Sequence, residues 1–138
     1  MKNISIDSEL LLSSLNNEKI MTVDELKSTL TTQCRMTVFR KLSMLGYISS
    51  YSHSGKYYSL KRIARYNRYG IWSYQSALFS KNGTLKKTIK SLIDSSTQGY
   101  TASELKGIVK VKVEDALLEL VKNKIIIRKK ISGIYIYY

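Results

Sequence analysis

The side chains best suited to bind a ligand lie in residues 33–41, where polar and basic residues recur at helical spacing. Cys34, Val38, Leu42 and Leu45 predict one buried stripe of a helix. Side chains on the opposite face and its flanks can hydrogen-bond to base edges or hold phosphates. A solvated helix face is the alternative for the same side chains. The candidate nucleic-acid contacts on this helix are Gln33, Arg35, Met36, Thr37, Arg40 and Lys41.

A hairpin is predicted directly after this helix. Gly46 follows the last apolar position, as glycine commonly does at a helix end. Tyr47–Tyr51 and Lys56–Leu60 are rich in aromatic and polar residues that suit half-buried strands, and Ser52–Gly55 forms the turn. Such a loop can lie along a phosphate backbone or enter a minor groove. Its candidate contacts are His53, Ser54 and Lys56.

The next segment is basic and aromatic. Ser59 is positioned to cap a short helix over Lys61–Tyr66, with Gly70 ending the element. Basic residues interleaved with tyrosines suit phosphates, and also single strands whose bases stack on rings. A solvated basic helix is the alternative. The candidate contacts here are Arg62, Arg65 and Arg68.

Signatures of catalysis and metal binding are missing from the sequence. It contains no phosphate-binding glycine loop, no H-E-x-x-H and no G-x-S-x-G motif. His53 and Cys34 are the only histidine and cysteine, too few for a zinc site. Asp24-Glu25 and Glu114-Asp115 are helix neighbours whose carboxylates diverge. We therefore expect a non-enzymatic protein without a metal, cofactor or small-molecule ligand.

The charge of the chain indicates its class of partner. Twenty-three Lys and Arg oppose 10 Asp and Glu, a net charge of +13 that favours an anionic partner over simple solubility. An apolar content of 43% is enough for globular cores. No signal peptide or membrane span is visible, so we expect a cytoplasmic, nucleoid-associated protein that does not bind a membrane.

The elements before residue 33 complete a recognisable order. Asp7–Leu15 predicts a short amphipathic helix, and Lys19–Met21 a short extended segment. Thr22 and Glu25 form a capping box for the next helix. Helix, short strand, helix, turn, helix and hairpin follow one another as in a winged helix-turn-helix domain.

The second half of the chain repeats the first. The segment starting at Thr101 matches the one starting at Thr22, and Gly133–Ile136 matches Gly55–Tyr58. The sequence therefore predicts an α+β protein with two tandem winged helix-turn-helix domains, each of three helices and a β-hairpin wing. Residues 1–60 form the first, residues 61–83 a basic and aromatic connector that packs the lobes, and residues 84–138 the second.

The helix of the second half that corresponds to residues 33–45 carries a different surface. With Val113, Ala116, Leu117 and Leu120 inward, carboxylates and a leucine remain outside. We interpret Glu114, Asp115 and Leu118 as protein contacts rather than phosphate contacts. The hairpin that follows can still grip a phosphate backbone through Arg128, Lys129 and Lys130. If a homodimer forms, its candidate contacts are Leu118, Ile134 and Ile136.

One segment resembles a known class of proteins. Residues Thr37–Ile48 (TVFRKLSMLGYI) look like the recognition-helix segment of winged-helix transcription regulators. The longer run through Tyr51–Tyr58 (YSHSGKYY) is similar to small tandem winged-helix proteins of bacteria and archaea found near mobile elements. The resemblance covers Thr22–Tyr74 well and the second lobe in outline.

The residues and the resemblance together lead to one expected function. It is sequence-specific binding of double-stranded DNA by a transcriptional regulator or an accessory factor of a mobile element. Two alternatives stay open. One is a winged-helix scaffold for protein interactions, and the other is a protein that binds single-stranded DNA or RNA through the Lys61–Tyr69 segment.

Overall fold

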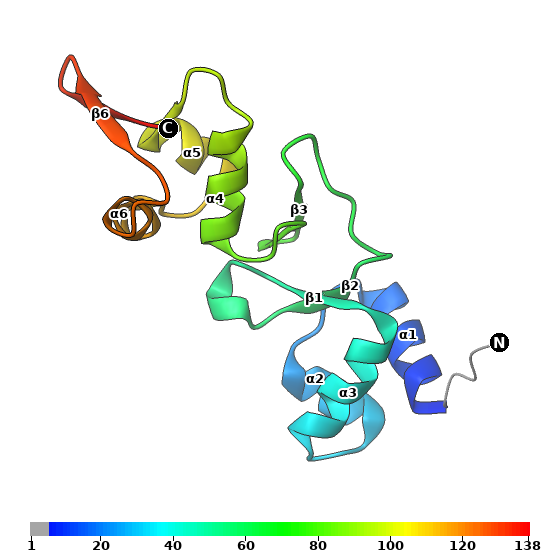
Figure 1. Ribbon diagram of the computed structural model, residues 1–138. Coiled ribbons are helices and arrows are strands. Elements are labelled where there is room, and N and C mark those ends of the chain that lie inside the picture. The colour runs from blue at the N-terminus through cyan, green and yellow to red at the C-terminus, as the bar shows by residue number, and fades with distance from the viewer. Residues whose placement is uncertain (1–5) are drawn as a thin grey trace. The chain divides into compact units, whose positions relative to one another are not determined.

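The computed structural model describes residues 6–138 as an α+β fold of helices and small antiparallel sheets (Figure 1). Two compact units divide the chain. The first holds the described residues up to Arg65 together with Trp72–Phe79, and the second holds Tyr66–Ile71 with Ser80–Tyr138. None of the helices in the described part is both long and apolar enough to cross a membrane.

Three helices form most of the first unit: α1 (Ile6–Glu18), α2 (Val23–Leu30) and α3 (Arg35–Leu45). Each carries apolar residues at helical spacing, and each packs against the other two. The predicted helices at these places are confirmed. The fully buried side chains that they share are Leu11, Leu15, Leu26, Val38 and Leu42.

The ends of α2 are defined by local hydrogen bonds. Thr22 Oγ1 accepts from the Glu25 amide (3.3 Å), and Glu25 Oε1 accepts from the Thr22 amide (2.9 Å), so the predicted capping box is confirmed. Thr31 ends the helix in the left-handed region, with φ of 51°. The chain then needs only three more residues before α3 begins.

The predicted hairpin after α3 is present but shorter. Strands β1 (Tyr47–Ser49) and β2 (Tyr58–Leu60) pair antiparallel, and the loop between them includes the 3₁₀ turn η1 (His53–Gly55). Met21 bridges to Tyr58 through two backbone hydrogen bonds of 2.9 and 2.8 Å. The extended segment before α2 therefore joins the hairpin on the free edge of β2.

The helix predicted over Lys61–Tyr66 is wrong. Residues 61–63 form a turn, and the chain after them is irregular. The Ser59 hydroxyl donates to the Lys19 carbonyl (2.6 Å) and so does not cap a helix. Ile63 and Ala64 are buried, which fixes this turn against the first unit without helical geometry.

A second hairpin, which the sequence did not predict, follows this turn. It consists of β3 (Ile71–Tyr74) and β4 (Ala77–Ser80). Within the first unit the rings of Trp72 and Phe79 lie 4.9 Å apart, and the Leu78 carbonyl accepts from the Tyr51 amide (2.9 Å). The apolar residues of this segment are buried, as their types suggest.

In the second unit, the helices and the hairpin of residues 84–138 follow the same order as those of residues 6–60 in the first unit. Thr84 caps the first helix of the second unit by accepting from the Lys87 amide (3.2 Å). A second capping box joins Thr101 and Glu104, and Lys110 ends that helix with φ of 60°, like Thr31. The elements are α4 (Leu85–Asp94), β5 (Tyr100–Thr101), α5 (Ala102–Val109), α6 (Glu114–Lys122), β6 (Arg128–Ile131) and β7 (Ile134–Tyr137).

The strands of the second unit form one sheet in the order β5-β7-β6, all antiparallel. Strand β6 therefore lies at an edge. The core beneath the sheet and helices contains Ile89, Leu105, Val109, Val113 and Leu117. The inward positions predicted for α6 are confirmed, because Ala116, Leu117 and Leu120 are buried.

Candidate nucleic-acid interface

The predicted contact residues on α3 lie at or near the surface. Arg35 and Arg40 are exposed, Met36 is 81% exposed, and Thr37 and Lys41 are half-buried. Gln33, just before the helix, is exposed as well. Val38 and Leu42 face inward, so a helical period does separate the two faces.

Cys34 does not belong to the buried stripe, and that prediction is wrong. The helix begins at Arg35, so Cys34 is its N-cap residue and is exposed. Its amide donates to Thr32 Oγ1 (3.1 Å). Hydrogen bonds from Thr37 lower the pKa of the Cys34 thiol below its usual value, and the charge of Arg40 adds to this effect. The first turn of α3 therefore favours negative charge.

An aromatic cluster holds the first turn of α3 against the hairpin. The Arg35 guanidinium carbon lies 4.7 Å from the centre of the Phe39 ring. Phe39 in turn contacts Tyr47 (5.7 Å between ring centres) and Tyr58 (5.2 Å). Arg35 is thus positioned by a ring that is itself packed on β1 and β2.

The loop of this hairpin is held at its base. Ser52 Oγ accepts from the Leu78 amide (2.9 Å) and lies 2.9 Å from His53 Nδ1. The ring of Tyr57 lies 5.3 Å from the His53 ring and 5.2 Å from Lys56 Nζ. His53, Ser54 and Lys56 are all exposed. A buried serine thus fixes a loop whose tip presents polar and basic groups to solvent.

A groove in the first unit brings α3 and this loop together. Its lining includes Arg35 from α3, Ser54 and Lys56 from the loop, and Asp24 and Lys27 from α2. Lys27 was not predicted. It lies on the outer side of α2, and its position in a basic chain beside the turn before α3 was the only signal available.

A second hollow of this unit adjoins the groove. Gln33 and Lys27 line this hollow, which is formed by α2 and the turn that follows it. Arg40 and Lys41 line neither of these two hollows. The structure therefore brings Arg35, Ser54 and Lys56 to one groove and places Gln33 next to it. The residues of the second half of α3 lie further along the helix.

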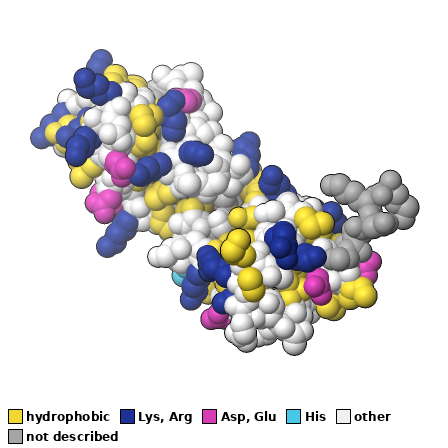
Figure 2. Space-filling model, turned by 60° about the horizontal axis from the view of Figure 1, so that its bottom comes forward, with side chains coloured by type: hydrophobic (Ala, Val, Ile, Leu, Met, Phe, Trp, Pro, Cys, Tyr) yellow, Lys and Arg dark blue, Asp and Glu magenta, His cyan; other side chains and the backbone are white. Residues whose placement is uncertain are grey.

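Three cations of this surface, on α3 and in the loop, form no ion pair with a described carboxylate. Within residues 6–138 the two ion pairs given by the structure, Lys86–Glu119 and Lys90–Asp94, both belong to the second unit. Arg35, Arg40 and Lys56 form no ion pair with any described residue. Figure 2 shows Lys and Arg side chains exposed on the unit that carries α3. Such cations are available to phosphates.

The basic residues after the first hairpin are divided between the two units. Arg62 and Arg65 are exposed and belong to the first unit, whereas Arg68 belongs to the second. Arg68 donates to the Tyr69 hydroxyl (2.8 Å), and its guanidinium carbon lies 4.8 Å from the Tyr69 ring centre. Arg68 and Tyr69 line a hollow of the second unit with Lys81.

The outer face of α6 is acidic, as predicted. Glu114 and Asp115 are exposed, and Leu118 is 55% exposed. Glu114 Oε2 accepts from the Val113 amide (3.0 Å) at the start of the helix. Hydrogen bonds from the backbone amides of Glu114 and Val113 lower the pKa of the Glu114 carboxyl, and the charges of two nearby lysines reinforce this effect.

The hairpin β6–β7 carries exposed cations beside tyrosines. The guanidinium carbon of Arg128 lies 4.3 Å from the centre of the Tyr135 ring, and Lys130 Nζ lies 5.6 Å from it. Lys129 Nζ lies 6.0 Å from the ring of Tyr138. All three cations are exposed, as contact with phosphates would require.

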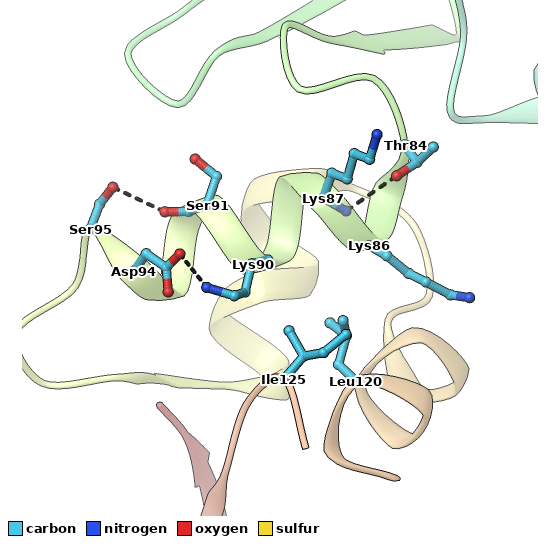
Figure 3. A pocket seen from close by; sticks show the side chains of 9 residues that line it. All are labelled: Thr84, Lys86, Lys87, Lys90, Ser91, Asp94, Ser95, Leu120 and Ile125. Atoms are coloured by element: carbon cyan, nitrogen blue, oxygen red, sulfur yellow. Dashed lines mark hydrogen bonds and ion pairs between the residues drawn. The ribbon is translucent and has the colours of Figure 1, made fainter. Parts of the chain in front are cut away.

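An apolar hollow in the second unit is a poorer candidate for an anion. Leu120 and Ile125 form its floor beside α4 (Figure 3). Two of its lysines are engaged, because Lys86 pairs with Glu119 and Lys90 pairs with Asp94, the latter pair drawn in Figure 3. Their charge is largely balanced where they stand.

No group of three or more His, Cys, Asp or Glu side chains that could hold a metal ion occurs in residues 6–138. No known protein family, curated protein or solved structure matches this chain. The arrangement of the first unit can therefore be judged only by its own chemistry. It offers unpaired cations, a polar loop and a helix N-terminus around one open groove.

Proposed function

We propose that this chain is a sequence-specific double-stranded DNA-binding protein, acting as a transcriptional regulator or as an accessory factor of a mobile element. In this proposal the two units are tandem winged helix-turn-helix domains. Helix α3 enters the major groove, and the β1–β2 loop is the wing that contacts the adjacent backbone. The order of elements in both units and the Met21–Tyr58 bridge support this assignment.

The observation that carries the proposal is the shared groove of α3 and the wing. Arg35 of α3 and Ser54 and Lys56 of the loop line it together with Lys27 and Asp24 of α2, and neither Arg35 nor Lys56 forms an ion pair with a described residue. In duplex DNA the major groove lies directly beside a phosphate backbone. A helix end and a neighbouring loop that both carry unpaired cations can therefore contact the groove and the backbone at the same time. The net charge of +13 adds long-range attraction.

Base recognition in this proposal comes from the exposed residues of α3 and the turn before it. Arg35 and Arg40 can bind guanine through two hydrogen bonds, and Gln33 can bind adenine in the same way. The Phe39 ring under Arg35 restricts the guanidinium, which lowers the entropy lost when it binds. Lys56 in the wing would hold phosphate without sequence preference.

The second unit plays a different part in the proposal. Carboxylates at the start of α6 would face phosphates if this helix entered a groove, and that contact is repulsive. Only its hairpin, with Arg128, Lys129 and Lys130, is suited to the DNA backbone. The two units would therefore bind DNA unequally.

The test compares two double charge reversals of equal size. Arg35→Glu with Arg40→Glu should lower affinity for a selected duplex by about 100-fold or more. Lys106→Glu with Lys124→Glu, at exposed positions of the second unit, should cost about threefold or less. The duplex is obtained first by selection from random DNA. Equal losses of DNA affinity in both variants would mean that binding depends on net charge alone. That result would refute a base-reading surface on α3.

A second candidate function rests on the Arg68 hollow of the second unit. Arg68, Lys81 and two tyrosines, Tyr69 and Tyr100, line it, a combination that suits the phosphate and stacked base of a single strand. Competition between duplex DNA, single-stranded DNA and RNA in one gel-shift series separates the two functions. Preference for a single strand that Tyr69→Ala abolishes would favour this second candidate over the first.

A further inference from the structure

The hairpin β6–β7 exposes an apolar side on which Lys129 is the one cation. Lys129 lies opposite Ile136, and Ile131 lies opposite Ile134. The pairing extends by one step, because Ile127 and Tyr138 exchange two backbone hydrogen bonds of 3.1 and 2.9 Å. Side chains of alternate residues share one side of a strand pair. We call the resulting set the isoleucine face: Ile127, Lys129, Ile131, Ile134, Ile136 and Tyr138.

The isoleucine face is open to solvent. Ile127 and Ile134 are each 57% exposed, and Ile131 is 49% exposed. Figure 2 shows apolar and cationic side chains intermingled at the left of the view, on the unit that carries this hairpin. A contiguous apolar group of this kind marks an interaction site in most soluble proteins. The opposite side of the hairpin, with Arg128 and Lys130 over Tyr135, is the side suited to phosphates.

Edge-to-edge pairing of two β6 strands does not fit this hairpin. Strand β6 lies at the edge of its sheet and carries Arg128, Lys129 and Lys130 in succession. Two such strands side by side would bring six cations together, a device by which natural edge strands resist pairing with one another. The isoleucine face itself carries one cation, Lys129, so an apolar surface with an unpaired carboxylate would complement it.

The chain itself contains a surface of that description on α6. We call it the acidic face of α6. A hollow there is lined by Asp115, Leu118, Glu119, Lys122 and Asn123. Leu118 is 55% exposed, and of the two carboxylates in this lining Glu119 pairs with Lys86. Asp115 forms no ion pair with a described residue. An apolar centre with an acidic border complements isoleucines around Lys129.

We propose that a second copy of this chain covers the isoleucine face. The isoleucine face of each copy packs on the acidic face of α6 of the other, which closes a two-fold symmetric dimer. Lys129 of one copy faces the Asp115 position of the other, and the isoleucines surround Leu118. The contact does not depend on DNA, and it leaves Arg128 and Lys130 on the open side of the hairpin. A DNA-free dimer is thus a claim separate from the proposed function.

The first experiment measures mass without DNA. Sedimentation equilibrium of the full chain at about 1–100 µM, at low salt, should show a monomer–dimer equilibrium. Ile134→Ser should raise the dimer dissociation constant by about tenfold or more, because it removes an apolar side chain from the interface. Thermal unfolding checks that the exposed substitution leaves the fold intact. A monomer at every concentration would overturn the proposal.

The second experiment tests which surfaces meet. Lys129→Glu alone and Asp115→Lys alone should each weaken the dimer about tenfold, and the two together should restore it. Lys130→Glu is the matched control, because the same charge change lies on the other side of the same hairpin. It should leave the dimer unchanged. A dimer indifferent to Lys129→Glu, or a double variant as weak as the singles, would refute this pairing.

DNA variants distinguish the two proposals. Arg35→Glu with Arg40→Glu should leave the dimer dissociation constant unchanged, because α3 takes no part in the contact. Loss of the dimer in that variant would overturn the interface proposed here. Loss of DNA binding with an intact dimer would support both proposals.

Discussion

Tyr51 is a residue whose environment gives a measurable pH dependence. It precedes the loop of the first hairpin, and burial raises the pKa of its hydroxyl to about 12. The unfolded chain, with a tyrosine pKa near 10, loses this proton first as pH rises. The contribution of Tyr51 is therefore fully present below about pH 10 and is lost as pH rises toward about 12.

Replacing Tyr51 with Phe should flatten the loss of stability in alkali. Urea unfolding between about pH 9 and pH 12 should show a smaller fall in the free energy of unfolding for Tyr51→Phe than for the unaltered chain. Tyr135→Phe, at an exposed ring of the other hairpin, is the control. If the free energy of unfolding fell equally steeply with pH in Tyr51→Phe and in the unaltered chain, the pH dependence would not come from Tyr51.

Gly99 shows how one residue type fixes an element. Its φ is +77°, and a Cβ there would lie 2.6 Å from the Tyr137 carbonyl oxygen and 2.9 Å from Ile136 Cγ2. The turn into β5 thus passes directly against β7. Both the conformation and the close approach exclude any larger side chain without a shift of the backbone.

Two glycine-to-alanine substitutions should therefore change the free energy of unfolding in opposite directions. Gly99→Ala should lower the free energy of unfolding by more than about 1 kcal/mol, because Ala is strained at this φ and collides with β7. Gly107→Ala, inside α5 with no atom within 4 Å of the added carbon, should raise it by about 0.5–1 kcal/mol. Urea titration of the full chain measures both. A neutral Gly99→Ala would show that the turn can move.

Elements with strong local signals were predictable from the sequence. The Thr22–Glu25 capping box and the apolar spacing of α1, α2 and α6 depend on neighbours in the chain, and these predictions are confirmed. The fold class, α+β with small antiparallel sheets, is also confirmed. The assignment of the two units to tandem winged helices stays a proposal.

Elements that depend on distant partners were not predictable. The Ser59 hydroxyl is used by the Lys19 carbonyl, forty residues away, so a local capping argument failed. The β3–β4 hairpin turns at Gln75, a non-glycine residue with φ of 53°, for which no turn signal existed. Cys34 was misplaced because α3 starts one residue later than its apolar period suggests.

The sequence allowed us to predict which residues of the candidate site are exposed. It did not allow us to predict which of them lie together in one groove. Exposure of Arg35 and Lys56 agrees with the prediction, but nothing in the sequence places them around one groove. That grouping depends on the aromatic contacts of Phe39 and on the hydrogen bond from the Leu78 amide to Ser52. Whether these residues touch DNA stays a prediction.

At the scale of the whole molecule, the net charge of +13 predicts that affinity for DNA depends strongly on salt concentration. A protein that neutralises several phosphates loses affinity with a log–log slope of about −0.9 for each contact. We expect a steep slope for the unaltered chain. Lys56→Gln in the wing should reduce its magnitude by about 0.9 and weaken all duplexes alike.

Arg35→Gln gives the contrasting result in the same measurement. It should weaken the preferred duplex more than an unrelated one, because a base contact carries sequence preference and a phosphate contact does not. Fluorescence anisotropy across a salt series, with both duplexes, measures both variants. Identical salt slopes for Lys56→Gln and the unaltered chain would show that Lys56 of the wing does not contact phosphate.

The position of the only cysteine has a practical consequence. Cys34 is exposed at the start of α3, and its lowered pKa makes the thiolate available under mild conditions. A maleimide dye or a nitroxide would therefore couple at one defined place without any engineering of the chain. Energy transfer from that dye to a labelled end of an oligonucleotide would report how far the start of α3 lies from that end of a bound duplex.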